Sequence, residues 1–156
     1  METENTYKFC SDKTGSYSKE NSAATASPKS INPADFKILL VDDESDLLEY
    51  FSFIIERVGY KVETASGGNE AFKKFEAGAY DMVITDIRMP QGDGVSLIKN
   101  IRNINKSTPV FCVTGFSEIT SAQLLDLGAN AVFEKPINRE KVLNQIQQTF
   151  STAKDS

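Results

Sequence analysis

The sequence predicts an α/β protein built on a doubly wound parallel sheet, and two observations lead to this fold class. Short apolar runs alternate five times with stretches in which apolar residues recur at helical spacing. Acids, a threonine and a lysine directly follow several of these apolar runs. The carboxyl ends of parallel strands form the ligand-binding edge of such a sheet, so the same pattern predicts where a site would lie.

The first two strand–helix units open the predicted sheet. KILLV (37–41) is a continuous apolar run, which is typical of a parallel strand buried on both faces. Apolar residues then recur at helical spacing as far as Val58, and Gly59 is a natural helix stop. KVETA (61–65) alternates apolar and polar residues, which indicates a strand nearer an edge, and the helix after it ends at Gly78.

Three further units repeat the pattern. The strands expected here are DMVIT (81–85), PVFCVT (109–114) and the short AVFE (131–134). Their helices are predicted over 95–101, 121–127 and 142–150. Asn138 is the expected N-cap of the last helix. Strict alternation implies right-handed crossovers with helices on both faces, and we expect the flavodoxin-like (βα)5 strand order 2-1-3-4-5.

The composition restricts the partners and the compartment. A net charge of −5 and a pI near 4.8 argue against direct nucleic-acid binding, which needs clustered basic residues. Histidine is absent, which excludes histidine-based metal sites and general bases. Cys10 and Cys112 show no paired spacing, so we expect a reduced, cytoplasmic protein with Cys112 buried. No signal peptide or membrane-length apolar run is present, so no membrane contact is expected.

Residues 1–35 differ in kind from the rest of the chain. They are rich in small polar residues, contain no Leu or Val, and include one Ile. Such a segment cannot bury enough apolar surface to offset its ordering entropy, so we expect a disordered N-terminal arm. Two roles stay open for it: a plain tail, or a segment that docks on a partner through Tyr7, Phe9 and Tyr17.

Five polar side chains lie at the carboxyl ends of the expected strands or directly after them: Asp42, Asp43, Asp86, Thr114 and Lys135. At the carboxyl edge of the sheet, the acids after the first and third strands would face each other and repel. A hard cation such as Mg²⁺ relieves that repulsion, because it prefers carboxylate oxygens with water and phosphate completing its shell. One carboxylate could then attack a phosphoryl donor, with the lysine and threonine contacting the phosphoryl oxygens.

Four stretches, LLVDDE, DMVITDIRMPQGDG, VFCVTG and FEKP, resemble the signatures of the receiver domain of two-component response regulators. The resemblance covers about residues 36–153, which we expect to form one receiver domain similar to the stand-alone chemotaxis regulators. It implies Mg²⁺, with Mn²⁺ as the alternative ion, and a phosphoryl group donated by a sensor histidine kinase or a histidine phosphotransfer protein.

The resemblance also implies a role for each matching residue. Asp86 would be the phosphoacceptor, Asp43 a direct metal ligand and Asp42 a ligand acting mainly through water. The Arg88 backbone carbonyl would be a further metal ligand. Thr114 would be the switch hydroxyl and Lys135 the phosphate-contacting lysine, and Pro136 is a candidate for a cis peptide bond.

Departures from the family pattern affect signalling and hydrolysis. Val132, beside Phe133, stands where many receivers carry the aromatic switch residue, so we expect only modest coupling to the output surface. Gly115 leaves space for a phosphoryl donor. Arg88 and Phe116 match the two positions that flank the hydrolytic water, and an apolar ring cannot orient that water. Slow self-dephosphorylation is therefore expected.

Two functions from different classes follow. The first is a single-domain phosphorylated switch that changes its binding to a downstream protein or relays its phosphoryl group, and acts on no outside substrate as an enzyme would. The second is a phosphorylation-independent adaptor with a receiver fold. The sequence after the last predicted helix is short, so no attached output domain is expected, although a receiver segment of a larger hybrid kinase is the alternative.

Overall fold

A computed structural model of the chain describes residues 30–115 and 119–154. Within these residues one sheet has the order β2-β1-β3-β4-β5, with every neighbouring pair parallel. The elements are η1 (Pro33–Asp35), β1 (Lys37–Val41), α2 (Ser45–Val58), β2 (Lys61–Ala65), α3 (Gly68–Ala77), β3 (Met82–Asp86), α4 (Gly94–Ile104), β4 (Val110–Thr114), α5 (Ser121–Leu127), β5 (Ala131–Glu134) and α6 (Arg139–Lys154). The predicted fold class and strand order are confirmed.

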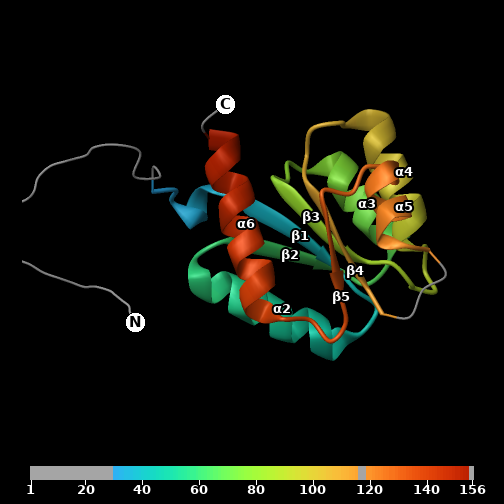
Figure 1. The fold of residues 1–156 in the computed structure, drawn as a ribbon, viewed down its shortest axis with the longest axis horizontal. Helices are drawn as coiled ribbons and strands as arrows, with labels where there is room; N and C mark the ends of the chain where they lie inside the picture. Colours follow the sequence, from blue (N-terminus) through green and yellow to red (C-terminus); the bar gives the residue numbers. More distant parts are fainter. Residues whose placement is uncertain (1–29, 116–118, 155–156) are drawn as a thin grey trace, which may run out of the picture.

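Helices cover both faces of the sheet: α2 and α6 lie on one side, and α3, α4 and α5 on the other (Figure 1). The core divides in the same way, because successive side chains of a strand point to opposite faces. Along β1, Ile38 and Leu40 pack with α2 and α6, whereas Leu39 and Val41 pack with α3 and α4. A strand buried on both faces must be apolar throughout, which explains the continuous run in the sequence.

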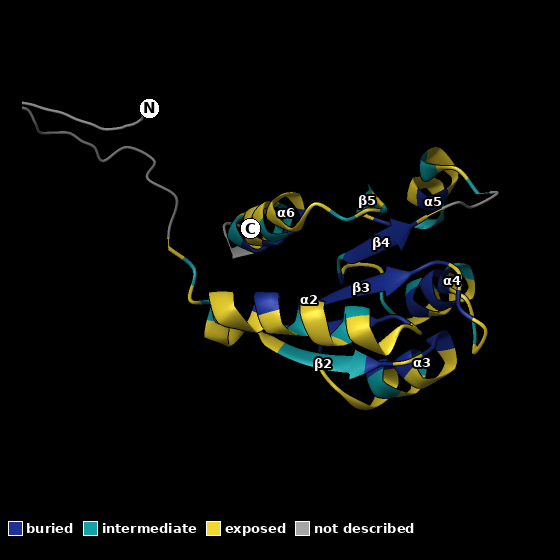
Figure 2. Cartoon of the chain, turned by 90° about the horizontal axis from the view of Figure 1, so that it is seen from below, coloured by how far each residue is buried: buried dark blue, intermediate teal, exposed yellow. Residues whose placement is uncertain are grey.

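Burial separates the central strands from the edge strands. β3 and β4 are buried along their whole length, whereas β2 and β5 are mostly half-buried (Figure 2). The alternating sequence of β2 had indicated an edge position, and this prediction is confirmed. The apolar centre therefore holds the two strands that carry Asp86 and Thr114 at their carboxyl ends.

Parallel register brings the predicted acids together. Val41 of β1 lies opposite Thr85 of β3, so the next residues, Asp42 and Asp86, emerge side by side at the carboxyl edge. β3 runs one residue further than the sequence indicated, and Asp86 is its last residue. The acid is consequently held by the strand itself, whose backbone is fixed by pairing on both sides.

The chain ends of the fold differ in how well they were predicted. Asn138 caps α6 as expected, because its side-chain oxygen accepts a hydrogen bond from the Lys141 amide at 3.0 Å. The short helix η1 precedes the expected domain start at residue 36: it lies beside the C-terminal part of α6 (Figure 1), and Phe36 stacks on Phe150 with ring centroids 4.1 Å apart. Residues 1–29 of the predicted arm, including its three aromatic residues, lie outside the described residues.

Arg102 ties the C-terminal end of α5 to α4. Its guanidinium donates to the Gly128 carbonyl at 2.8 and 3.0 Å, to the Asn130 side-chain oxygen at 2.9 Å and to the Asn105 carbonyl at 3.1 Å. The same Asn130 oxygen accepts the amide of Val110 at the start of β4. α5 fully buries only Leu124, so this polar network adds to the limited apolar packing of the helix.

No helix in residues 30–115 and 119–154 combines the length and hydropathy of a membrane span.

Replacing Arg102 by methionine tests this anchor. Met keeps an apolar stem but loses every donor, so the carbonyls of Gly128 and Asn105 are left unpaired by side chains. We expect the free energy of unfolding to fall by about 2 kcal/mol, measured by urea denaturation. Lys99→Met, at an exposed position on the same helix, is the control and should change stability by less than about 0.5 kcal/mol. Equal losses in both variants would contradict the anchoring role.

Candidate functional site

Three carboxylates meet at the carboxyl edge of the sheet. Asp42 and Asp43 directly follow β1, and Asp86 ends β3; each offers one oxygen such that all three lie within 4.8 Å of one another. Asp42 and Asp86 are buried, whereas Asp43 is exposed. Buried carboxylates this close cannot all be charged without a counter-charge, so the cluster needs cations.

Lys135 supplies one positive charge. Its ammonium nitrogen lies 3.3 Å from Oδ2 of Asp86, and the backbone amide of Ile87 donates to Oδ1 at 2.8 Å. The lysine reaches this place because it directly follows β5, where its own amide donates to the Thr114 carbonyl at 2.8 Å. Both oxygens of Asp86 are thus held in place, one by the backbone and one by an ammonium group.

The electrostatics of the cluster leave one acid poorly stabilised. Burial raises the pKa of Asp42 to about 6, and the charge of Asp86 adds to this, although the Glu44 amide donates to its Oδ1 at 2.9 Å. Burial alone would lower the pKa of Lys135, but the charges of Asp86 and Asp42 outweigh it and raise that pKa. The lysine therefore stays charged, whereas ionised Asp42 needs further positive charge nearby to be stable.

A hollow of about 250 Å³ opens above Asp86 toward solvent. Its lining consists of Asp43, Glu44, Asp86, Arg88, Gly115 and Lys135. Thr114 lies at the adjoining end of β4 and is buried, and its hydroxyl donates to the Gly115 carbonyl over a long distance of 3.4 Å. The hollow has room for a phosphoryl-sized group next to Asp86.

Glu44 was missed as a site residue by the sequence reasoning, although it lines the hollow and its charge helps to raise the pKa of Lys135. The available signal was its place directly after the acid pair. Of the other predicted positions, Val132 packs with the α3–α5 side of the core and Phe133 with the α2–α6 side, near Phe111. Phe116 lies outside the described residues.

Two further predictions are confirmed beside the site. The Lys135–Pro136 peptide bond is cis. Cys112 is fully buried, and burial raises the pKa of its thiol to about 12, as expected of a small core residue.

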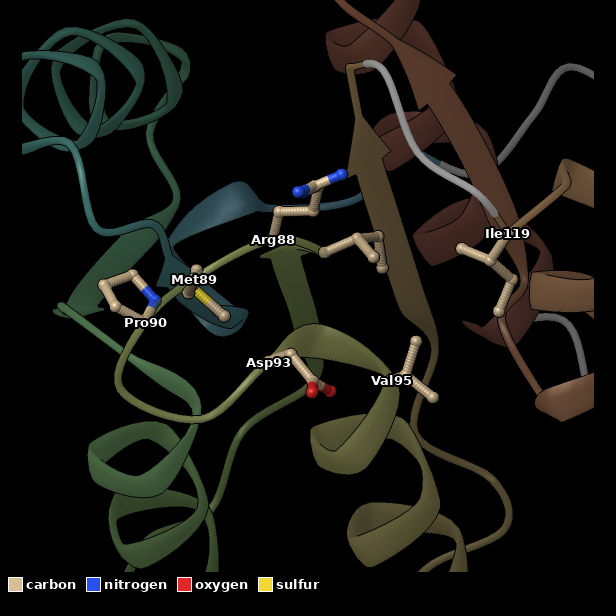
Figure 3. Close-up of a pocket in the computed structure, with 7 residues that line it drawn as sticks. Arg88, Met89, Pro90, Asp93, Val95 and Ile119 are labelled. Carbon is tan, nitrogen blue, oxygen red and sulfur yellow. The ribbon is translucent and has the colours of Figure 1, made fainter.

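A second, larger cavity of about 610 Å³ lies on the other side of the β3–α4 loop. Figure 3 shows Met89 and Pro90 on that loop and Val95 at the start of α4, with Ile119 completing the lining near α5. Arg88 lines both cavities, so the loop forms the wall between them.

The acidic cluster fits a hard divalent cation. Mg²⁺ prefers oxygen ligands and is held in proteins by one or two carboxylates with water and phosphate oxygens. Here three carboxylate oxygens lie within 4.8 Å of one another beside a hollow open to solvent. The positive charge around Asp42 is too small to offset the burial of its carboxylate. The donor set contains no sulfur or imidazole, which would favour softer metals.

The sequence matches the family model of the response regulator receiver domain over residues 38–147. The chain belongs to this family. The receiver domain is 37% identical over 112 residues to a transcriptional regulatory protein, the CpxR homolog of Haemophilus influenzae, covering 71% of this chain and 48% of that protein. It is 36% identical over 107 residues to the regulatory protein PhoP of Bacillus subtilis, covering 68% and 45%. The chain spans about half the length of these curated relatives.

Solved structures place the receiver domain in the same fold. A CheY-like receiver domain protein from Methanospirillum hungatei superimposes with a TM-score of 0.73 at 28% identity, covering 77% of this chain and 97% of that one. The response regulator TrrA of Thermotoga maritima, solved in complex with Mg²⁺ and BeF, gives a TM-score of 0.67 at 32% identity, covering 72% and 97%.

The raised pKa of Asp42 predicts that a neutral residue at this position stabilises the fold, and that the gain in stability depends on pH. In EDTA, the folded receiver holds the Asp42 proton more tightly than the unfolded chain does, so this group favours folding below pH 4 and loses that contribution as pH rises through about 6. Asp42→Asn should therefore raise the free energy of unfolding by about 2 kcal/mol at pH 7, with no gain below pH 4.

Urea denaturation at a series of pH values measures this effect. Asp46→Asn, at an exposed position in the first turn of α2, is the control and should give no gain at any pH. Equal stability of Asp42→Asn and wild type at pH 7 would contradict burial as the dominant cause.

Proposed function

We propose that this chain is a phosphorylated signalling switch in which Asp86 accepts a phosphoryl group from a histidine kinase or a histidine phosphotransfer protein. The observation that carries the proposal is the contact of 3.3 Å between Lys135 Nζ and Asp86 Oδ2, within a cluster of three carboxylates that borders an open hollow. A purely structural ion pair would not need two further acids beside it, because they add only repulsion.

Each side chain has a chemical part in the transfer. An oxygen of the Asp86 carboxylate attacks phosphorus, the phosphorus–nitrogen bond of the donor phosphohistidine breaks, and its electron pair returns to the imidazole. Lys135 is placed to contact the phosphoryl oxygens, and the Thr114 hydroxyl can donate to them. Mg²⁺ held by Asp42, Asp43, Asp86 and the Arg88 carbonyl would supply positive charge to the transferring group. Mn²⁺ fits the same oxygen donors.

The exposed face of α2 suits the phosphodonor protein. Tyr50 and Phe53 are 46% and 57% exposed, and they neighbour each other one helical turn apart. The guanidinium of Arg57 lies 5.6 Å from the Phe53 ring centroid. Adjacent aromatic residues left in solvent indicate an interaction surface. α2 begins two residues after the acid pair, so a donor bound to it would reach Asp86.

The downstream partner would bind α5, β5 and α6. A hollow of about 310 Å³ on this face is lined by residues that include Val132, Phe133 and Pro136, and Leu125 of α5 is 48% exposed. Val132 has no aromatic ring to rotate, so a change at Thr114 would reach this face through packing and backbone shifts. We therefore propose a coupling free energy near the low end of about 1–3 kcal/mol.

Three wider expectations belong to the same proposal. The domain would catalyse only its own phosphorylation and dephosphorylation, and would not be an enzyme acting on other substrates. It would act in the cytoplasm. A net charge of −5 supports the absence of direct nucleic-acid binding by this chain, although the curated relatives are named transcriptional regulators.

Incubation with Mg²⁺ and acetyl phosphate tests the proposal. We expect the intact mass to increase by one phosphoryl group in the wild type and in the control Asp126→Asn, an exposed α5 variant, but not in Asp86→Asn. Backbone amide shifts should extend from Thr114 to β5 and α6 when the beryllofluoride mimic is added. If Mg²⁺ binds but neither phosphoryl group nor mimic is taken up, the phosphorylation-independent adaptor becomes the better function.

Slow self-dephosphorylation is the second expected property. Arg88 lines the hollow, and a guanidinium has donors but no acceptor, so it cannot take a proton from an attacking water. After removal of the donor, the phosphoryl group should persist for minutes or longer, followed by mass. Arg88→Asn supplies an amide oxygen and should shorten the half-life several-fold, whereas Arg57→Asn should not. A wild-type half-life of seconds would contradict this expectation.

A further inference from the structure

The first turn of α3 is hydrogen-bonded to the β3–α4 loop. The Gly68 amide donates to the Gly92 carbonyl at 2.9 Å, and the Asn69 amide donates to the Gln91 carbonyl at 3.2 Å. These two N–H groups belong to the first helical residues, which have no partner inside their own helix. The N-cap residue, Gly67, has no side chain to satisfy them, so the loop carbonyls take that place.

The contact leaves no space for a side chain at Gly67 or Gly68. A Cβ at Gly67 would lie 2.6 Å from the Gln91 carbonyl oxygen, and one at Gly68 would lie 2.5 Å from the Gly92 oxygen. Gly67 has an extended backbone with φ −171°, which any residue can adopt, so close approach and not backbone conformation requires glycine there. Gly92 differs, because its φ of +88° is itself unfavourable for other residues. We call these two hydrogen bonds, together with Gly67, Gly68 and Gly92, the clamp.

The clamped loop is the one that carries Arg88. The two ends of this loop are joined by a hydrogen bond of 2.9 Å from the Gly94 amide to the Ile87 carbonyl. A Cβ at Gly94 would lie 2.3 Å from the Asp86 carbonyl oxygen. Between the two attachments, Met89 is buried and Arg88 is exposed. The backbone at Arg88 is therefore restrained from both sides, by the end of β3 and by α3.

We infer that Gly67 and Gly68 are positioning residues for the acidic site. Through the clamp they hold the β3–α4 loop in the backbone conformation that lets the Arg88 backbone carbonyl serve as a metal ligand. The inference rests on the proposed function, in which the Arg88 carbonyl binds Mg²⁺. Neither glycine lines the hollow above Asp86, so each acts through the loop and not by contact with the metal or the phosphoryl group. Weakening the clamp would cost metal affinity in addition to stability.

A matched pair of glycine substitutions separates these two effects. Gly68→Ala places a methyl group against the loop backbone. Gly59→Ala strains the C-cap of α2, where φ is +118°, and Gly59 lies against Pro33, which precedes β1 at the opposite end of that strand from the acids. Both variants should unfold more easily in EDTA. Mg²⁺ alone is the probe, titrated while the amide shifts of residues 87–94 are followed.

We expect the Kd for Mg²⁺ to rise about tenfold in Gly68→Ala and to stay at the wild-type value in Gly59→Ala. Gly67→Ala should behave as Gly68→Ala does. A wild-type Kd in Gly68→Ala would overturn the inference and leave the proposed function intact. A wild type that shows no Mg²⁺ response would instead overturn the proposed function and the inference together.

Hydrogen exchange on the wild type provides a test that does not depend on the folding of a variant. Coupling between two sites is reciprocal, so if the clamp supports Mg²⁺ binding, Mg²⁺ must in turn stabilise the clamp. The amides of Gly68 and Asn69 should then exchange several-fold more slowly at saturating Mg²⁺. The Gly78 amide, which bonds Lys74 at the other end of α3, is the internal control and should be unaffected. Unchanged exchange at Gly68 and Asn69 in a protein that binds Mg²⁺ would overturn the inference.

Discussion

Repulsion among Asp42, Asp43 and Asp86 is the constraint on which the site depends. The three acids are brought within 4.8 Å by strand pairing that the apolar core stabilises, and Asp42 and Asp86 are largely removed from water. One ammonium group, Lys135, compensates part of the negative charge. The carboxyl edge of the sheet therefore carries uncompensated negative charge. Such a site binds a divalent cation, and the cation in turn binds the oxygens of a phosphoryl group.

The geometry of this site is maintained by backbone contacts. The Asp86 carboxylate accepts the amide of Ile87, and the loop beyond it is attached to α4 through Gly94 and to α3 through Gly68. Backbone atoms on paired strands and helix ends move less than long side chains do, so the acids are held near one another despite their repulsion. Lys135 reaches Asp86 through its side chain alone, with its ammonium nitrogen 3.3 Å from Oδ2.

The β5 side of the sheet is less buried than its centre. Most of β5 is half-buried and α5 fully buries a single residue, so less of this region is removed from water than of the central strands. The Arg102 network fixes the C-terminal end of α5. The N-terminal end of α5 is the end nearer in sequence to Thr114 and Gly115. Less buried elements change conformation most readily, which supports the proposal that the downstream partner binds this face.

The sequence by itself determined the five strand–helix units, the edge character of β2, and the placement of Asp42, Asp43, Asp86, Thr114 and Lys135 at strand ends, because hydrophobic periodicity and chain order are local properties. The tertiary structure alone decided the contact of Glu44 with the hollow, the burial that raises the pKa of Asp42, and the Arg102 network. It also decided why Gly67 must be glycine, since its neighbour in space is Gln91, 24 positions along the chain. These features depend on distances between segments remote in sequence, and such distances are set only when the helices pack on the sheet.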